Sequence, residues 1–334
     1  MSCIHNNTHH RILSMPELNQ SKKQSLVLSK HLYQLADETH DDRYRSQADR
    51  VSACSTIWVG MYCPQCGTYH YMHTTGCKHR LCPTCAAKAA RVTAMQALEA
   101  IEYIQPSQAS LLTLTVQNVE GEDLSRNIDS QLAAWQKLRK LRMFDRLVSG
   151  WARTIEIVPA LHDRKYHPHV HAIILHDTPL GDMAYSGWWS LSWRDCMGLD
   201  YNPICDIRPI EDRQGAVFEV SKYISKLSRI YDNSEREHDN IRYIGNAIYN
   251  RQLRTYGGSW LKARRALRLL AVEQMDDDAI SEYGEIADTT CEQCKSELVQ
   301  VSLYWAGLTY RQDGIPMTGL QTNDIIGGTS DEIW

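Results

Sequence analysis

The sequence predicts an α+β protein in which helices flank a central antiparallel sheet, with a zinc-ribbon-like module before the sheet and a basic helical region after it. Strand-like and helix-like segments follow one another through the middle of the chain, and two of the strands are consecutive and form a hairpin. Cysteine pairs precede these segments and Arg-rich sequence follows them. We therefore predict five regions: a polar arm (1–50), a zinc-binding module with a helix (51–105), the α+β domain (106–235), a basic helical region (236–272), and an acidic linker with a last cysteine pair (273–334).

The chain has 334 residues, of which 43% are hydrophobic, so it can bury a sizeable core. No stretch approaches the ~20 apolar residues of a membrane span, and the amino terminus lacks the residue order of a signal peptide. We therefore expect a cytoplasmic protein. Most of the eleven cysteines lie in Cys-x-x-Cys pairs, which in a reducing compartment predicts metal binding in place of disulfide bonds.

Charge is distributed unevenly along a chain whose formal net charge is −4. No Asp or Glu occurs between Val51 and Leu98, although Lys and Arg do, and a second basic stretch covers 241–272. Both stretches predict surfaces that attract nucleic-acid phosphates, whereas the alternative for the second is a solvated helix face. The candidate phosphate-binding residues are Arg251, Arg254, Lys262, Arg264 and Arg265. Acidic residues concentrate between 273 and 288, which indicates a solvated linker.

Two cysteine pairs have the spacing C-x2-C-x15-C-x2-C, which is typical of a zinc ribbon. Each turn presents two thiolates, so two turns complete a tetrahedral structural zinc site. The four predicted ligands are Cys63, Cys66, Cys82 and Cys85. Cys77 is a surplus thiol in this module. Cys291 and Cys294 form one further pair without a partner pair nearby, and a strand-like segment follows them, so they are candidates for a second zinc site.

Hydrophobic periodicity gives the order of the elements. Helical spacing of apolar residues, with good helix formers, predicts helices at 86–104, 124–148, 188–197 and 214–229. Segments rich in β-branched and apolar residues predict strands at 110–116, 151–159, 168–176 and 203–210. An amphipathic patch at 25–36 is the one helix-like feature of the amino-terminal arm.

The most informative strand begins with His167-Pro-His-Val-His171 and continues into an unbroken apolar run. Alternate side chains of a strand share a face, so His169 and His171 offer two imidazoles to one metal ion. If the preceding strand forms a symmetric hairpin across the loop at 160–166, Glu156 lies opposite His171 and on the same face. We therefore predict Glu156 as the third ligand, the alternative being an ordinary surface residue of a strand.

On the predicted helix at 214–229, Glu219 and Tyr223 are four residues apart and share one face, with Lys226 one turn further on. A protonated tyrosine, with a pKa near ~10, is a weak nucleophile and needs a metal-polarised electrophile, a neighbouring cation or a base. The histidine strand and this helix together offer all three, and Lys226 could stabilise the phenolate or the developing charge. The alternative is that Tyr223 is a packing residue.

Three segments, taken in order, resemble the motifs of plasmid rolling-circle replication initiators of the HUH endonuclease superfamily, in the branch with a single tyrosine and a nearby glutamate. They are Leu112-Thr-Leu-Thr-Val-Gln-Asn118, His167-Pro-His-Val-His171 and Glu219-Val-Ser-Lys-Tyr223-Ile-Ser-Lys226. Residues 249–262 also resemble a segment that follows the tyrosine in that family, and the cysteine pairs resemble those that such initiators often carry in front.

The resemblance implies an HUH-type domain that nicks single-stranded or cruciform plasmid origin DNA, with host replication proteins as further partners. It implies that His169 and His171, with a third ligand, hold Mg²⁺ or Mn²⁺. Tyr223 would attack the scissile phosphate and leave a 5′-phosphotyrosyl link and a free 3′-OH. Glu219 would activate water for the terminating cleavage. His167 departs from the pattern, because the superfamily name describes only two histidines around an apolar residue.

Two other functions fit parts of the sequence. The segment that starts at His167 also resembles the histidine triad of nucleotide hydrolases, in which one imidazole is the nucleophile and no metal is needed. That chemistry would leave Tyr223, Glu219 and the zinc module without a role. The second alternative is a non-catalytic zinc protein that binds single-stranded DNA and has structural histidines.

Overall fold

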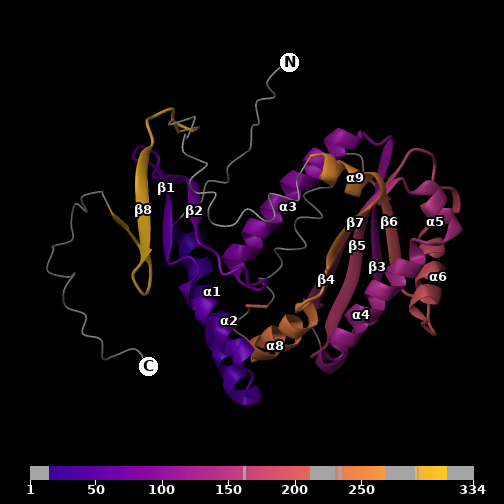
Figure 1. Cartoon of the computed structure of the whole chain (residues 1–334), viewed down its shortest axis with the longest axis horizontal. Helices are drawn as coiled ribbons and strands as arrows, with labels where there is room; N and C mark the ends of the chain where they lie inside the picture. The colour runs from indigo at the N-terminus through magenta and orange to yellow at the C-terminus, as the bar shows by residue number, and fades with distance from the viewer. Residues whose placement is uncertain are drawn as a thin grey trace. The chain divides into compact units, whose positions relative to one another are not determined.

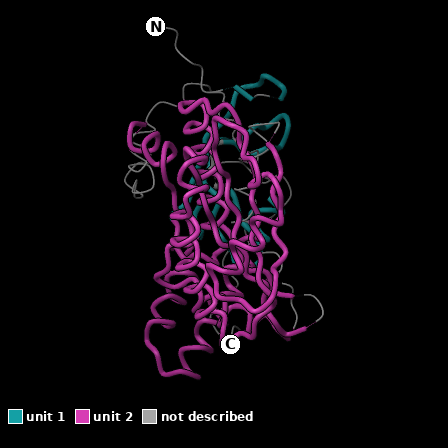
Figure 2. The backbone as a smooth tube through the Cα atoms, turned by 90° about the vertical axis from the view of Figure 1, so that its right-hand side faces the viewer, with its two compact units in different colours: residues 1–20, 55–75, 286–334 teal, residues 21–54, 76–285 magenta. Residues whose placement is uncertain are grey.

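The computed structural model describes residues 15–160, 163–210, 230–231, 235–267, 290–291 and 293–313, which fall into two compact units (Figure 2). Unit 1 contains residues 1–20, 55–75 and 286–334, and unit 2 contains residues 21–54 and 76–285. The units differ from the five regions expected from the sequence, because unit 1 combines the first Cys-x-x-Cys pair with the last one.

Unit 1 is built on a four-stranded antiparallel sheet of order β2-β1-β8-β9. Its strands are β1 (Ile57–Cys63), β2 (Thr68–Thr74), β8 (Val299–Trp305) and β9 (Tyr310–Asp313). Leu18, Trp58 and Leu303 are buried in its core. The strand-like segment predicted after the last cysteine pair is therefore β8, and its residues 299–304 pair with β1.

Unit 2 is built on a five-stranded antiparallel sheet of order β6-β3-β5-β4-β7, with the histidine strand β5 at its centre. Its strands are β3 (Gln108–Thr115), β4 (Gly150–Pro159), β5 (Tyr166–His176), β6 (Cys205–Pro209) and β7 (Arg254–Gly257). This sheet confirms the predicted α+β class, the β4-β5 hairpin and the antiparallel pairing.

Helices cover both faces of this sheet, with α3 and α9 on one side and α4, α5 and α6 on the other (Figure 1). The helices of the described residues are α1 (Met15–Thr39), α2 (Asp42–Ala53), α3 (Pro83–Ile104), α4 (Gly121–Leu138), α5 (Arg142–Leu147), α6 (Ser186–Met197), α8 (Glu237–Ile248) and α9 (Gly258–Ala266), with a short 3₁₀ turn at Gly181–Ala184. None of them combines the length and the apolar character that crossing a membrane requires.

The helices on both faces of the sheet explain the apolar run of β5. Val170 and Ile174 pack with Trp135 of α4 in the larger core, whereas Ile173 packs with Trp260 of α9 and with α3 in the smaller one. A strand that is covered on both faces needs apolar residues at successive positions, not at alternate ones. The histidines at the start of β5 lie on the α3 side.

The amino-terminal arm, predicted to have one helix-like patch at 25–36, forms the helices α1 and α2. Two predictions for unit 2 also differ from the structure. The helix predicted at 124–148 is two helices, because Leu141 has an extended backbone and Phe144 of α5 turns back to meet Trp135 edge-on at 5.9 Å. The basic region at 236–272 is not wholly helical, because β7 joins the sheet beside β4. At Gly257 a Cβ atom would overlap the Trp151 ring, so the strand-to-helix corner requires glycine. The helix predicted at 214–229 and the acidic linker lie outside the described residues.

Candidate metal centres

Glu156, His169 and His171 come together on the α3 side of the central sheet, at neighbouring positions of β4 and β5. The Glu156 Oε2 atom lies 2.9 Å from His169 Nε2 and 3.3 Å from His171 Nε2. All three residues are buried. The predicted juxtaposition of this carboxylate with the two imidazoles is therefore present in the structure.

The register that produces this cluster differs from the predicted one by two residues. Glu156 lies opposite His169, and Val158 lies opposite His167. Because side chains of a strand alternate with a period of two, a shift of two residues keeps Glu156 on the same face. The prediction of the face was correct and the prediction of the cross-strand partner was wrong, since β4 ends at Pro159 as predicted but β5 begins at Tyr166, two residues earlier than predicted.

The second nitrogen of each imidazole has its own partner. His169 Nδ1 donates to the carbonyl oxygen of His167 at 3.2 Å, and His171 Nδ1 lies 3.1 Å from the Thr113 hydroxyl of β3. Because a carbonyl oxygen only accepts, the Nδ1 atom of His169 carries the proton. In the neutral ring its Nε2 lone pair therefore faces the carboxylate oxygen, an arrangement that a cation stabilises.

The donor set fits a divalent metal ion. Octahedral Mg²⁺, with ligands at about 2.1 Å, places adjacent ligand atoms roughly 3.0 Å apart, close to the separations found here. Two imidazoles with one carboxylate also suit Mn²⁺, because nitrogen ligands favour transition metals over Mg²⁺. The fixed Nδ1 partners orient both rings toward such an ion.

His167 lies at the edge of this cluster. Its Nδ1 atom is 3.0 Å from Asn118 Oδ1, and its ring centroid is 5.0 Å from that of His169. Burial lowers the pKa of His167, and the neighbouring His169 lowers it further. His167 therefore lies beside the cluster, outside the group of three possible ligand residues.

Four cysteines meet in unit 1, at the end of its sheet where the β1-β2 turn begins. They are Cys63, Cys66, Cys291 and Cys294. Sulfur atoms lie 3.4 Å apart in the Cys63-Cys294 pair and 3.8 Å apart in the Cys66-Cys291 pair. Hydrogen bonds from the Ser296 hydroxyl and then from the Cys66 amide lower the pKa of Cys63 to about 6, so it favours the thiolate.

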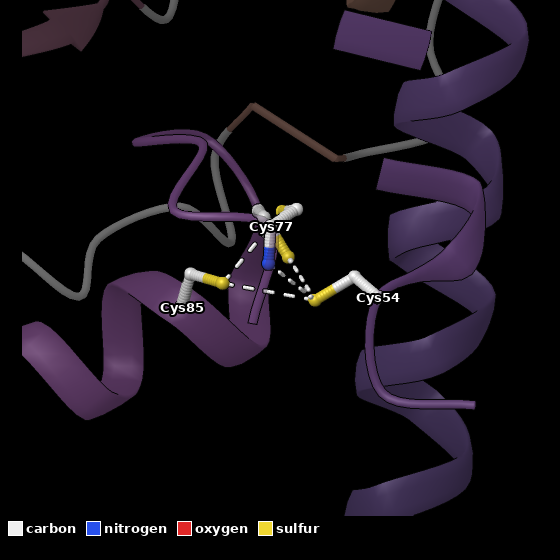
Figure 3. Close-up of side chains that lie close together, drawn as sticks. Cys54, Cys77 and Cys85 are labelled. Atoms are coloured by element: carbon white, nitrogen blue, oxygen red, sulfur yellow. Dashed lines mark hydrogen bonds between the residues drawn. The ribbon is translucent and has the colours of Figure 1, made fainter. Parts of the chain in front are cut away.

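A second group of four cysteines lies in unit 2 (Figure 3). Its members are Cys54, Cys77, Cys82 and Cys85. Cys54 follows α2, Cys82 is the N-cap residue of α3 and Cys85 lies in the first turn of α3. The Cys54-Cys85, Cys77-Cys85 and Cys54-Cys82 sulfur separations are each 3.6 Å.

Both groups fit tetrahedral zinc. A Zn–S distance of about 2.3 Å separates the sulfur atoms of such a site by roughly 3.8 Å. A disulfide requires an S–S distance of about 2.05 Å, far shorter than any separation here. In unit 2 the Lys22 ammonium, 1% exposed, donates to the Cys54 carbonyl oxygen at 2.6 Å. This cation interacts electrostatically with Cys54, Cys82 and Cys77 and would offset part of the negative charge of a four-thiolate zinc site.

The predicted zinc-ribbon set is therefore wrong in its grouping. Cys63 and Cys66 join Cys291 and Cys294, whereas Cys82 and Cys85 join Cys54 and Cys77. Ribbon spacing identifies thiols that can bind metal, but it cannot predict a contact between Cys63 and Cys294, which are more than two hundred residues apart. Two signals pointed to the correct grouping: Cys77 was surplus, and the last cysteine pair had no partner pair.

The candidate phosphate-binding residues have different surroundings. Lys262 and Arg265 are exposed on α9. Arg264 is a core residue, 1% exposed, that donates to Gln96 Oε1 and stacks over Tyr256, so the prediction that it contacts nucleic acid is wrong. Sequence alone did not distinguish it from Arg265 because the two are adjacent in one basic run.

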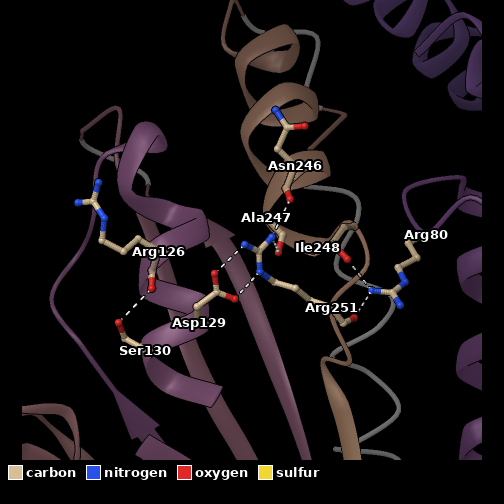
Figure 4. A network of polar contacts seen from close by, with 8 residues as sticks. All are labelled: Arg80, Arg126, Asp129, Ser130, Asn246, Ala247, Ile248 and Arg251. Carbon is tan, nitrogen blue, oxygen red and sulfur yellow. Dashed lines mark hydrogen bonds and ion pairs between the residues drawn. The ribbon is translucent and has the colours of Figure 1, made fainter. Parts of the chain in front are cut away.

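Arg251 is also engaged within the protein (Figure 4). Its guanidinium binds both carboxylate oxygens of Asp129, at 2.6 and 2.8 Å, and donates to the carbonyl oxygens of Asn246 and Ala247. The bidentate pair joins α4 to the end of α8 and lowers the pKa of Asp129. The guanidinium of Arg251 therefore has a structural role.

Arg254 lies on the same face of the sheet as the Glu156 cluster. It is the β7 partner of Thr154, which in turn pairs with His171 across β4 and β5. Its Nη1 atom donates to the Thr93 hydroxyl of α3, and its Nε atom has no acceptor among the described residues. The predicted catalytic residues Glu219, Tyr223 and Lys226 lie outside the described residues.

Comparisons with known proteins converge on one group. The family described as a replication protein matches residues 69–306. The chain is 27% identical to "Protein rep" of Bacillus amyloliquefaciens over 79% of this chain and 88% of that protein. It is 25% identical to "Protein rep" of a Bacillus species over 85% of this chain and 98% of that protein. It is 28% identical to "Protein rep" of Streptococcus pneumoniae over 60% of this chain and 66% of that protein. No solved structure matches the chain with significance.

The two cysteine groups predict about two zinc ions per chain in the purified full-length protein, measured by elemental analysis. Cys82→Ser and Cys294→Ser should each reduce the content to about one, because each removes a ligand from a different group. Cys196→Ser is the matched control, since Cys196 is a buried thiol outside both groups and its loss should leave two. If Cys82→Ser and Cys294→Ser together removed only one ion, the grouping would be wrong.

Proposed function

Because this chain belongs to the replication protein family, we propose that it is a plasmid replication initiator that nicks single-stranded origin DNA with a metal ion and a tyrosine nucleophile. The observation that carries the proposal is the buried cluster of Glu156, His169 and His171 on the central strand pair. Three convergent ligand atoms, on the face of the sheet that also carries α9 with its exposed basic residues, are suited to phosphodiester chemistry.

In this proposal Glu156, His169 and His171 hold Mg²⁺ or Mn²⁺ against the scissile phosphate. The ion would supply positive charge that draws electron density from a non-bridging oxygen of the phosphate. Thr113 and the His167 carbonyl oxygen keep the two imidazoles oriented toward it, because they hold the Nδ1 atoms.

Arg254 supports the same proposal from the far side of β4. Its side chain lies on the α3 face, and its Nε atom has no acceptor among the described residues. A guanidinium in this position would bind a phosphate next to the scissile one, in the bidentate manner that arginine favours. Lys262 and Arg265, exposed on α9, would bind the strand further away, with an affinity that falls as salt rises.

The proposed nucleophile is Tyr223, and the sequence motif is its support. The Oη atom attacks phosphorus in line, the P–O3′ bond breaks and the 3′ oxygen takes up a proton. The 5′ phosphate stays on tyrosine, and the free 3′-OH primes synthesis. Lys226, one turn further along the predicted helix, stabilises the phenolate. In the terminating cleavage Glu219 activates a water molecule, so that the protein is released without a second tyrosine.

The first test concerns the metal cluster. Glu156→Gln keeps the shape of the side chain but removes the charge, so Mn²⁺-dependent cleavage of a single-stranded origin oligonucleotide should fall at least ~100-fold. Binding of the uncut oligonucleotide, measured by fluorescence anisotropy, should stay near the wild-type value. Glu102→Gln, which changes an exposed carboxylate of α3, is the control and should cleave normally. Full cleavage by Glu156→Gln would exclude this carboxylate as a ligand.

The second test concerns the nucleophile. Tyr223→Phe removes the hydroxyl that forms the covalent bond, so no denaturation-resistant protein–DNA adduct should appear on a gel. Tyr185→Phe, at a tyrosine that is 70% exposed, should form the adduct normally. An undiminished adduct in Tyr223→Phe would refute the proposed chemistry, including the assignment of Tyr223.

The third test separates cleavage from release. Glu219→Ala should nick the oligonucleotide and form the adduct at a rate near that of the wild type, since Tyr223 remains. The adduct should then persist, because no carboxylate activates the water of the terminating step. Time courses of adduct formation and decay measure the two steps. Failure of Glu219→Ala to nick would contradict the proposal that Tyr223 carries out nicking and Glu219 acts only in release.

A further inference from the structure

A cavity of about 300 Å³ lies on the opposite face of the central sheet from the Glu156 cluster. It is lined by α4, by β4 and by the start of β7 through Leu132, Ala133, Gln136, Arg153, Gln252 and Thr255. Ala133, Gln136 and Gln252 are exposed and form its rim, whereas Arg153 is 2% exposed and forms its floor. All of these residues belong to unit 2.

Arg153 is a buried cation that forms no ion pair with any described residue. Its Nη1 atom donates to the Leu253 carbonyl oxygen at 3.1 Å, and its Nε atom has no acceptor among the described residues. Burial alone lowers its pKa to about 10. Since a buried charge is normally paired, this arrangement indicates an anion that the guanidinium is built to receive.

The groups around Arg153 are hydrogen-bond donors. Thr255 is the direct cross-strand neighbour of Arg153, and its buried hydroxyl likewise has no partner among the described residues. The Gln136 carbonyl oxygen accepts from Arg139 at 2.6 Å, which leaves the amide hydrogens of Gln136 to donate. The nearby carboxylate of Asp129 is neutralised by its bidentate pair with Arg251.

We propose that this cavity is a phosphate-ester site in which Arg153 and Thr255 bind the phosphate and the two rim glutamines bind the attached nucleoside. A phosphate offers several acceptor oxygens, which match the guanidinium of Arg153 and the hydroxyl of Thr255 better than the two oxygens of a carboxylate do. The cavity is also larger than a bare anion requires. The ligand is either a free nucleotide or a nucleotide of a bound strand, and in both cases the site is separate from the metal cluster.

Titration of the full-length protein with inorganic phosphate, dTMP and a thymidine octanucleotide tests the proposal. Arg153→Met should weaken binding of dTMP or of the octanucleotide at least tenfold, and Thr255→Val should weaken binding of the same probe several-fold. Arg126→Met is the matched control, since Arg126 is an exposed arginine of α4 that does not line the cavity and pairs with Asp123, and this variant should bind as the wild type does. Loss confined to the octanucleotide would identify the phosphate of a strand as the ligand, and loss of dTMP binding would identify a free nucleotide.

Thermal melting distinguishes a ligand site from a structural arginine. Without ligand, Arg153→Met should melt at the wild-type temperature or above it, because replacing an unpaired buried cation by an apolar side chain is neutral or stabilising. Excess dTMP should raise the melting temperature of the wild type but not that of the variant, and excess octanucleotide should raise it less in the variant than in the wild type. Equal affinity of wild type, Arg153→Met and Thr255→Val for all three probes would overturn the proposal.

Discussion

The pairing of β4 with β5 is the interaction on which the candidate site depends. This register brings the Glu156 carboxylate to the two imidazoles. A shift by one residue would turn Glu156 into the core on the α4 side and would expose the apolar run of β5 to the wrong neighbours. Because β5 is covered by helices on both faces, such a slip would move every side chain of the strand from one core to the other and would destabilise both cores. The packing of an ordinary hydrophobic core therefore fixes the geometry of the cluster.

The two faces of the central sheet carry different chemistry. The α3 face holds the cluster of Glu156, His169 and His171. Arg254 lies on the same face, two strands away from His171 at the same level of the sheet. The α4 face holds the large core and, near the β7 edge, the cavity above Arg153. Adjacent residues of one short strand, Arg254 and Thr255, thus contribute to opposite faces, since side chains of a strand alternate.

The cysteine groups connect distant parts of the chain. In unit 1 the β1-β2 turn and the last cysteine pair supply two thiols each, so a bound metal would close a loop of more than two hundred residues. Closing so long a loop costs entropy, but the cost grows only slowly with loop length and metal binding can offset it. In unit 2 the four thiols join the end of α2 to the start of α3, next to the buried Lys22.

The sequence by itself determined the elements, the chemistry of the side chains and the face on which each lies. Periodicity located β5 and α3, and alternation placed Glu156 with His169 and His171, because these are local properties of a strand or a helix. Cysteine spacing likewise identified residues able to bind zinc. These predictions needed no knowledge of distant contacts.

Only the tertiary structure decided which cysteines share a site, which arginines are buried and where the cavity lies. Cys63 meets Cys294, and Arg264 is enclosed while Arg265 is exposed, because elements far apart in the sequence pack together. Nothing in the sequence singled out Arg153, since the burial of a single arginine in a strand depends on the helix that packs over it. Burial and long-range pairing are properties of the folded chain, and local spacing does not record them.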